Sequence, residues 1–253
     1  MKKDIVKVSW SGGKDSSCAA HLRLSQGDEC IIVCYIPMFT DKIPLLLKNH
    51  YEFILHTADK FRQMGARVFL LHGETYWDFV HRRRVKGQRK GIPFGFPPFI
   101  RQNCSFKTYS KTKVLSDVDK EKQLLYDYED IGIAIDEKHR LNQLDERKRS
   151  ILVERGFTEQ MAADYCIKNG IYSPHYKEFK RDGCVLCPQA PPSLRVKWFQ
   201  ENPEAFYMVL QLQDFVKKEI PGQYPLREKS WFIEEDLQIG LFDKPGETRY
   251  LIN

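Results

Sequence analysis

The chain has 253 residues, of which 42% are hydrophobic and 29% are charged, and its formal net charge is +6. This length and composition allow one large α/β domain or a domain with a helical appendage. They argue against a membrane protein, since no apolar run approaches the roughly 18 residues that a membrane span needs. The basic N-terminus leads directly into a strand pattern without the apolar stretch of a signal peptide. We therefore expect a cytoplasmic protein whose modest positive charge suits anionic ligands such as nucleotides.

Strand and helix patterns alternate over residues 4–73. Strand patterns lie at 4–9, 30–36 and 66–73, and helix patterns lie at 15–26 and 50–65. The run 30–36 is almost wholly apolar, which is typical of a parallel strand buried on both faces. Alternation of this kind implies right-handed crossovers. We therefore predict an α/β fold with a parallel sheet covered on both faces.

The pattern changes in the rest of the chain. Residues 77–103 are rich in Arg, Lys, Gly, Pro and Phe and predict a long loop or insertion. A helix is expected over 107–118 and a strand over 130–135. Helical patterns dominate 150–170 and 193–218, with a loop containing two cysteines between them. We predict an α/β part over 1–150 and a mostly helical part over 151–253.

The stretch SGGKDS, residues 11–16, follows the first strand pattern and opens the first helix pattern. A loop in this position presents free backbone N–H groups, and the helix dipole adds positive potential. Glycines allow the backbone to approach a ligand closely. Lys14 adds a positive charge, and Ser11, Ser16 and Ser17 add hydroxyl donors. The spacing fits neither the phosphate loop of kinases nor the dinucleotide fingerprint, yet the residue types indicate a phosphate site.

SGGKDS resembles the signature of the PP-loop ATP pyrophosphatase superfamily. Further stretches resemble its phosphoadenosine phosphosulfate (PAPS) reductase-like family: GFPPFIRQNCSFKTYSK, IGIAIDEKHRL, and FTEQMAADYCIKNGIYSPHYKEFKRDGCVLCP. The resemblance runs from about residue 5 to residue 200. It implies a doubly wound parallel sheet of the adenine nucleotide alpha-hydrolase type, with the nucleotide over the carboxyl ends of the strands.

The resemblance also implies the ligand and the reaction. It places the phosphates of ATP, or of a related adenine nucleotide, on residues 11–16, with Asp15 organising Mg²⁺ or the loop. Members that use ATP cleave its α–β bond, so that the substrate is adenylylated and pyrophosphate leaves. The chain departs from true PAPS reductases, because no cysteine follows Cys187. The nucleotide-binding residues implied by these motifs are Ser9, Ser11, Gly12, Gly13, Lys14, Asp15, Ser16, Arg101 and Arg140.

The cysteines divide into two groups. Three of them, Cys18, Cys30 and Cys34, lie in apolar periodic segments and are expected in the core. Cys184 and Cys187 form a Cys-x-x-Cys turn, which is how paired metal ligands are often supplied, although a redox pair or two core thiols remain alternatives. Candidate third and fourth ligands are Cys104 and Cys166, the latter alternatively a buried thiol on its helix. Such a set would suit Zn²⁺ or a [4Fe–4S] cluster.

Charged groups elsewhere suggest further contacts. Asp136 and Glu137 are expected where a parallel strand ends, the edge at which α/β sheets bind ligands, although a turn with a surface ion pair is the alternative. There they would contact Mg²⁺, the ribose or the substrate, and Arg140 would meet an anion. Residues 81–101 combine a basic run with aromatic rings and suit either a nucleic-acid backbone or a solvated loop.

Three hypotheses follow from the sequence. The first is a PAPS reductase-like enzyme that performs adenylyl transfer or sulfur-related chemistry on an adenine nucleotide. The second is a tRNA or DNA sulfur-modification enzyme, and the third is a non-catalytic nucleotide sensor or partner subunit. For the enzymes, the candidate catalytic residues are Lys14, Asp15, Asp136 and Glu137. The acceptor, the metal and the oligomeric state are left open.

Overall fold

The computed structural model describes residues 4–97, 99–100, 103–143, 146–187 and 189–220. Its contacts divide the chain into two compact units. The first unit contains residues 1–37, 48–73 and 107–182, and the second contains 38–47, 74–106 and 183–253. The units interleave along the chain, whereas the sequence pattern suggests one division near residue 150. Each unit is described by itself.

The first unit is built on a five-stranded sheet in the order β3-β2-β1-β6-β7. The strands are β1 (Ile5–Trp10), β2 (Glu29–Tyr35), β3 (Arg67–Leu71), β6 (Tyr128–Ile131) and β7 (Lys148–Arg149). Every neighbouring pair is parallel. The predicted α/β fold with a parallel sheet is therefore confirmed.

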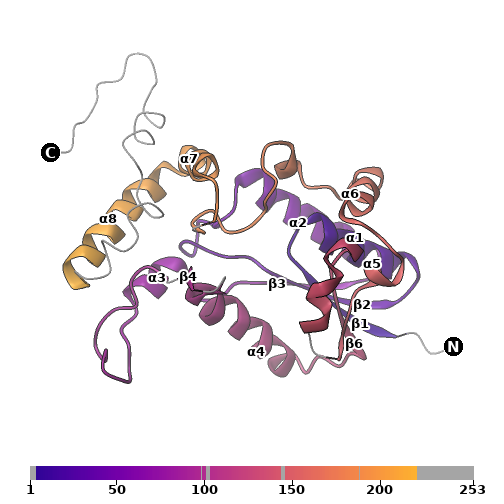
Figure 1. The fold of residues 1–253 in the computed structure, drawn as a ribbon, viewed down its shortest axis with the longest axis horizontal. Helices are drawn as coiled ribbons and strands as arrows, with labels where there is room; N and C mark the ends of the chain where they lie inside the picture. The colour runs from indigo at the N-terminus through magenta and orange to yellow at the C-terminus, as the bar shows by residue number, and fades with distance from the viewer. Residues whose placement is uncertain (1–3, 98, 101–102, 144–145, 188, 221–253) are drawn as a thin grey trace, which may run out of the picture. The chain divides into compact units, whose positions relative to one another are not determined.

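Helices cover both faces of this sheet. Helices α1 (Lys14–Ser25) and α2 (Lys48–Gln63) lie on one face and α4 (Lys113–Glu121) on the other (Figure 1). Alternate strand residues explain the division: Trp10 packs on Phe61 of α2, whereas Ile31 and Val33 pack with Val118 of α4. Two shorter helices, α5 (Ile151–Glu154) and α6 (Glu159–Lys168), pack against α1. The sheet is therefore doubly wound, as expected.

The strand expected over 130–135 lies earlier, at Tyr128–Ile131. The apolar run continues past the strand end, because Ile133 and Ala134 are buried in a turn rather than in the sheet. Residues Ile135–Gln143 form the 3₁₀ helix η2. Asp136 and Glu137 therefore belong to the first turn of η2, and the prediction that they directly end a strand is wrong.

The helix expected over 107–118 begins as the π-helix η1 (Lys107–Thr112), which continues into α4. A close contact between the backbone at Gly73 and Ser110 of η1 explains where η1 lies. A Cβ built on Gly73 would be 2.4 Å from Ser110 Oγ and 2.7 Å from the Ser110 carbonyl oxygen. Tyr35, the last residue of β2, forms a 2.6 Å hydrogen bond with Ser110. The π-helix is thus fixed against the ends of β2 and β3.

The second unit has its own aromatic core. It contains α3 (Tyr76–His81), the short strands β4 (Phe99–Ile100) and β5 (Asn103–Cys104), and the C-terminal helices α7 (Pro192–Glu201) and α8 (Pro203–Glu219). Phe39 packs on Tyr76 and Trp198, and the Trp198 indole donates to the Pro44 carbonyl. The prediction of helices in the C-terminal part is confirmed. The loop expected over 77–103 is partly wrong, because Thr75 caps α3 and the two short strands pair.

None of the helices in the described part of the chain is both long and apolar enough to pass through a membrane.

Candidate nucleotide site and charged hairpin

The predicted phosphate loop, residues 11–13, joins β1 to α1 at the middle of the sheet. On one side of β1 the chain adds β2 and β3, and on the other side it adds β6 and β7. The order of the strands therefore reverses at β1, and ligands of open α/β sheets bind outside the carboxyl ends of the strands at such a switch point. The glycine loop therefore lies at the position where open α/β sheets bind ligands.

Two glycines allow the loop to take its shape. Gly12 has φ +81°, in the left-handed region that glycine adopts without steric cost. Gly132, just after β6, has no room for a side chain, because a Cβ there would lie 2.4 Å from the Ser16 amide nitrogen and 2.6 Å from the Asp15 carbonyl carbon. The end of β6 can therefore contact the first turn of α1 only through a glycine.

The serines of the loop hold its backbone. The Ser11 amide donates to Ser16 Oγ at 3.2 Å, and Ser16 Oγ donates to the Gly13 carbonyl at 3.1 Å. The Gly13 amide donates to Ser11 Oγ at 3.3 Å. Ser11 and Ser16 thus bond to the loop itself.

Lys14 lies between two carboxylates. Its Nζ is 2.8 Å from Asp15 and 2.7 Å from Glu159 of α6. Burial alone would lower the pKa of Lys14, but hydrogen bonds and charge attraction to both carboxylates outweigh it, so that the pKa is raised. The pKa of Asp15 is also raised, first by burial and then by the charges of Glu159 and Glu137, against the attraction of Lys14. One ammonium shared by two carboxylates leaves this group net negative.

A tyrosine and an aspartate from the loop after α6 also reach the glycine loop. The Lys14 amide donates to the Tyr176 hydroxyl at 3.2 Å, and that hydroxyl donates to Asp182 at 2.8 Å. Tyr176 belongs to the 3₁₀ helix η3 (Pro174–Lys177). Neither residue was predicted from the sequence. The motif that contains them was visible, but their contact with a loop some 160 residues earlier was not.

Two buried histidines lie beside the same loop. His50 of α2 is fully buried, its Nδ1 bonds to Ser173 at 2.8 Å, and its Nε2 has no hydrogen-bond partner among the described residues. Its ring is 5.2 Å from that of His175, centroid to centroid. Burial lowers the pKa of His50 to about 4, the nearby Asp182 opposes this shift, and His175 adds to it. His50 is therefore neutral at physiological pH.

The other residues predicted to bind the nucleotide or to act in catalysis bond elsewhere in the first unit. The Ser9 hydroxyl donates to Glu129, and Asp136 accepts from the Glu159 amide at 3.2 Å. Glu137 and Arg140 form a surface ion pair, which is the alternative that the sequence left open for this turn. Arg101 lies outside the described residues. The structure thus brings Ser11, Gly12, Gly13, Lys14, Asp15 and Ser16 together, with Glu137 within electrostatic range of Asp15.

Cys166, a predicted metal ligand, is a buried thiol of the first unit. It packs with Cys18, Ala19 and Ala162, and its Sγ donates to the Lys14 carbonyl at 3.1 Å. A hydrogen bond with Cys18 and burial raise the pKa of the Cys166 thiol. Cys166 is thus placed as a buried thiol on its helix, the alternative that the sequence left open.

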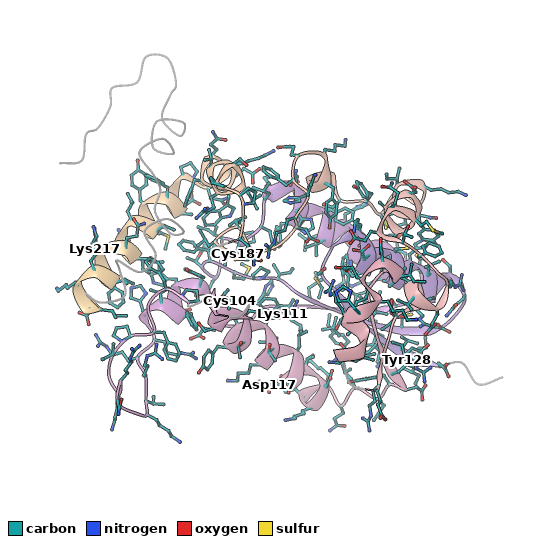
Figure 2. All side chains as sticks on the ribbon, in the orientation of Figure 1. Cys104, Lys111, Asp117, Tyr128, Cys187 and Lys217 are labelled. Atoms are coloured by element: carbon teal, nitrogen blue, oxygen red, sulfur yellow. The ribbon has the colours of Figure 1, made fainter. Side chains whose placement is uncertain are left out.

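Cys104, Cys184 and Cys187 belong to the second unit and are partly exposed. Cys104 and Cys187 are labelled in Figure 2. The Cys187 amide donates to the Cys184 carbonyl at 3.0 Å, so the two thiols share one tight turn. Within the described ranges, no three His, Cys, Asp or Glu side chains are grouped so that they could hold a metal ion. Of the predicted metal site, the structure thus shows the Cys184–Cys187 turn but no larger group of ligands among the described residues.

The basic run of the second unit forms an ordered structure, which we call the basic hairpin (residues 82–94). The Arg84 amide donates to Ile92, the Gly91 amide to Arg84, and the Phe94 amide to Arg82. The guanidinium groups of Arg82 and Arg84 lie 4.5 and 4.3 Å from the Phe94 ring centroid. The hairpin extends from α3 as a long loop (Figure 1), and residues 85–91 are exposed.

Comparisons with known proteins complete the description. No protein-family model matches the chain, and no curated protein gives a significant match. Among solved structures, the chain is similar to a 4-thiouridine synthetase in complex with RNA and with bound ATP, at 15% sequence identity and a TM-score of 0.46. The alignment covers 87% of this chain and 54% of that one, so the chain spans about half the length of that protein. Similarity at this level assigns neither a family nor a function.

Proposed function

We propose that the chain is a PP-loop enzyme that binds ATP or a related adenine nucleotide on residues 11–16. The observation that supports this most directly is the place of the glycine loop. It opens a 12-residue helix at the switch point of a doubly wound sheet, with a lysine in the first turn. The N-terminal N–H groups and the dipole of such a helix attract phosphate. The motif resemblance adds the adenine nucleotide and the PAPS reductase-like family.

The proposed reaction is adenylyl transfer. A nucleophilic atom of the acceptor attacks the α-phosphorus, the bond from that phosphorus to the bridging oxygen breaks, and pyrophosphate leaves with the electron pair. Lys14 stabilises the negative charge that develops on the phosphates. Mg²⁺ supplies further charge neutralisation when it is bound, and Asp15 is the residue proposed to hold it. The net negative charge shared by Lys14, Asp15 and Glu159 fits a cation there.

Titration with ATP and a pyrophosphate-release assay test this proposal. We expect ATP to bind to the wild-type chain and Lys14→Ala to weaken binding at least tenfold, since an ammonium next to the phosphates is lost. Lys48→Ala is the control, because Lys48 is exposed and its distance to Glu52 is 4.0 Å. Failure of folded wild-type protein to bind any adenine nucleotide would contradict the proposal. Binding without pyrophosphate release for any acceptor would favour the non-catalytic subunit.

The basic hairpin favours a second candidate, in which the acceptor is tRNA or DNA and the chemistry is sulfur modification. Between Arg82 and Lys90 the chain carries six cationic side chains and no acidic one. Glu74 and Glu219 pair with Arg82 and Arg83, while Lys86, Arg89 and Lys90 lie in the exposed segment. Cations on an exposed loop bind phosphate backbones mainly through counterion release.

Salt dependence tests this candidate. Binding of tRNA and of duplex DNA is measured between about 50 and 200 mM salt, for the wild type and for a Lys86→Gln, Arg89→Gln, Lys90→Gln variant. Each phosphate contact contributes roughly 0.7–0.9 to the slope of log K against log salt, so the triple variant should lose about 2 from the slope. An unchanged slope contradicts a role of the hairpin. Pyrophosphate release that requires tRNA or DNA would identify the nucleic acid as acceptor.

The Cys184–Cys187 turn supports a separate metal proposal, in which these two thiolates supply two of the ligands of Zn²⁺ or a [4Fe–4S] cluster. Within the described residues, Cys104, the predicted third ligand, is not grouped with them. Metal analysis of anaerobically purified protein, with its visible spectrum, tests it. The double variant Cys184→Ser, Cys187→Ser should lose the metal, while Cys166→Ser should keep it because that thiol is buried beneath α1. Equal metal content in the wild type and the double variant contradicts the assignment.

A further inference from the structure

The backbone amide of Lys14, the first residue of α1, is hydrogen-bonded to another part of the protein. The Lys14 N–H donates to the Tyr176 hydroxyl, and the hydroxyl in turn donates a hydrogen bond to Asp182. The same Asp182 oxygen lies 2.4 Å from the position that a Cβ on Gly13 would take. A carboxylate thus lies directly against the glycine loop. A helix N-terminus attracts negative charge, and in the free protein Asp182 supplies it.

The loop that carries Tyr176 and Asp182 is held from its other side. Ser173 bonds to His50 at 2.8 Å and accepts the His175 amide at 3.3 Å, and the His175 ring bonds to the Arg181 carbonyl. The contact with His50 attaches the loop to α2, and the other two contacts hold residues 173–181 together, so the approach of Asp182 to Gly13 belongs to an organised segment.

A second observation indicates that the site accepts a further group. His50 is fully buried, yet its Nε2 has no hydrogen-bond partner among the described residues. Its ring lies against the glycine loop, with Cε1 3.1 Å from the Cβ position of Gly12. Buried polar atoms are normally hydrogen-bonded. The orphan nitrogen beside Gly12 therefore indicates that this corner is completed by a molecule from outside the chain.

We propose that Asp182 occupies the place of a nucleotide phosphate in the free protein, and that Tyr176 becomes a phosphate ligand once the nucleotide displaces Asp182. The Tyr176 hydroxyl keeps the Lys14 N–H as its donor and turns its own hydrogen from the carboxylate to a phosphate oxygen. This inference rests on the proposed nucleotide site and adds two residues to it.

Electrostatics make the two occupants mutually exclusive. A phosphate and a carboxylate within a few ångströms repel each other strongly where water is scarce. Burial, together with the charge and hydrogen bond of Asp182, raises the pKa of Tyr176, so its hydroxyl keeps the proton that either anion accepts. Asp182 should therefore compete with the nucleotide, whereas Tyr176 should assist it.

Two neighbouring substitutions should act in opposite directions. Asp182→Asn keeps the size and the acceptor atom but removes the negative charge, and should tighten ATP binding by about tenfold. Tyr176→Phe removes the hydroxyl and should weaken ATP binding by about tenfold, a typical effect of one lost hydrogen bond to a charged group. A purely structural role would weaken binding in both variants. Binding is measured by calorimetry with ATP and, in parallel, with adenosine, whose binding should not change.

Glu178→Gln provides a matched control, since it removes one negative charge from an exposed side chain of the same loop. Thermal melting shows that each variant is folded. Hydrogen exchange of the Lys14 amide, without nucleotide, adds a readout of the free protein, and it should be faster in Tyr176→Phe.

The outcomes separate this inference from the proposed function. Absence of ATP binding in the wild type would contradict both the proposed nucleotide site and the displacement of Asp182. ATP binding by the wild type with unchanged or weaker binding by Asp182→Asn overturns the displacement alone. Unchanged Lys14 exchange in Tyr176→Phe overturns the contact from which the displacement is argued.

Discussion

The glycine loop of the first unit and the basic hairpin of the second unit use charge in different ways. In the glycine loop, the Lys14 ammonium forms ion pairs with Asp15 and Glu159, and the Lys14 amide donates a hydrogen bond to Tyr176. In the hairpin, the cations of residues 86–90 are exposed and the segment contains no carboxylate. Compensated charges in a partly buried site hold atoms in position. Exposed charges of one sign act over about a Debye length and weaken with salt. The first arrangement suits a small ligand and the second suits a polyanion.

The largest expected effect comes from breaking the geometry of the glycine loop. Gly132→Ala places a Cβ against backbone atoms of Ser16 and Asp15 that cannot rotate away. We expect the free energy of unfolding to fall by about 3 kcal/mol or more, with loss of ATP binding. Gly156→Ala is the matched control. Its φ of +69° carries the backbone strain, but nothing lies within 4 Å of the added Cβ, so about 1 kcal/mol is expected. Chemical denaturation measures both, and equal losses would contradict the close-contact argument.

The next largest effect depends on pH and concerns His50, beside the glycine loop of the first unit. The pKa of His50 is about 4 in the folded protein and roughly 6.5 in the unfolded chain. The fold therefore favours the neutral ring. Its contribution is complete above pH 6.5 and is lost as the pH falls from 6.5 towards 4, by up to about 3 kcal/mol.

The free energy of unfolding should thus fall more steeply over this pH range in the wild type than in His50→Gln. His56→Gln, on the exposed side of the same helix, should keep the wild-type slope. Identical slopes in all three proteins would show that burial of His50 does not control its protonation.

A smaller effect is expected when the ion pair between Lys14 and Glu159 is removed. Glu159 is 44% exposed, and exposed ion pairs contribute at most about 1 kcal/mol. Glu159→Gln should therefore change the free energy of unfolding by less than about 1 kcal/mol, while ATP binding becomes a few-fold tighter because Lys14 loses a competing carboxylate. Asp164→Asn, on the exposed face of the same helix, should leave ATP binding unchanged. Weaker ATP binding in Glu159→Gln would instead show that Glu159 assists the ligand.

The smallest effect on stability is expected at the hairpin. The triple variant Lys86→Gln, Arg89→Gln, Lys90→Gln should change the free energy of unfolding by less than about 0.5 kcal/mol, as is usual for surface substitutions. Its ATP affinity should equal that of the wild type at physiological salt. A large loss of stability would show that these cations are part of the packing of the second unit.

Local patterns identified the glycine loop and the inner strands correctly. The stretch SGGKDS places its glycines, serines and lysine within six residues, so their joint effect does not depend on distant parts of the chain. Strand β2 follows from an almost wholly apolar run that only a doubly covered sheet can bury. The end of β6 was misplaced because Ile133 and Ala134 are as buried as strand residues. Periodicity cannot distinguish a buried turn from a strand.

The amino-acid sequence alone determined an α/β fold with a parallel sheet, and it marked residues 11–16 as the candidate phosphate site. Only the tertiary structure brought Tyr176, Asp182 and His50 to that loop, buried Cys166 in the first unit, and showed that Gly132 must be a glycine. The physical reason is the separation along the chain over which each kind of interaction acts. Backbone conformation and helix capping act over a few neighbouring residues, whereas these contacts join positions as much as 162 residues apart, and they form only when the sheet and its helices have packed.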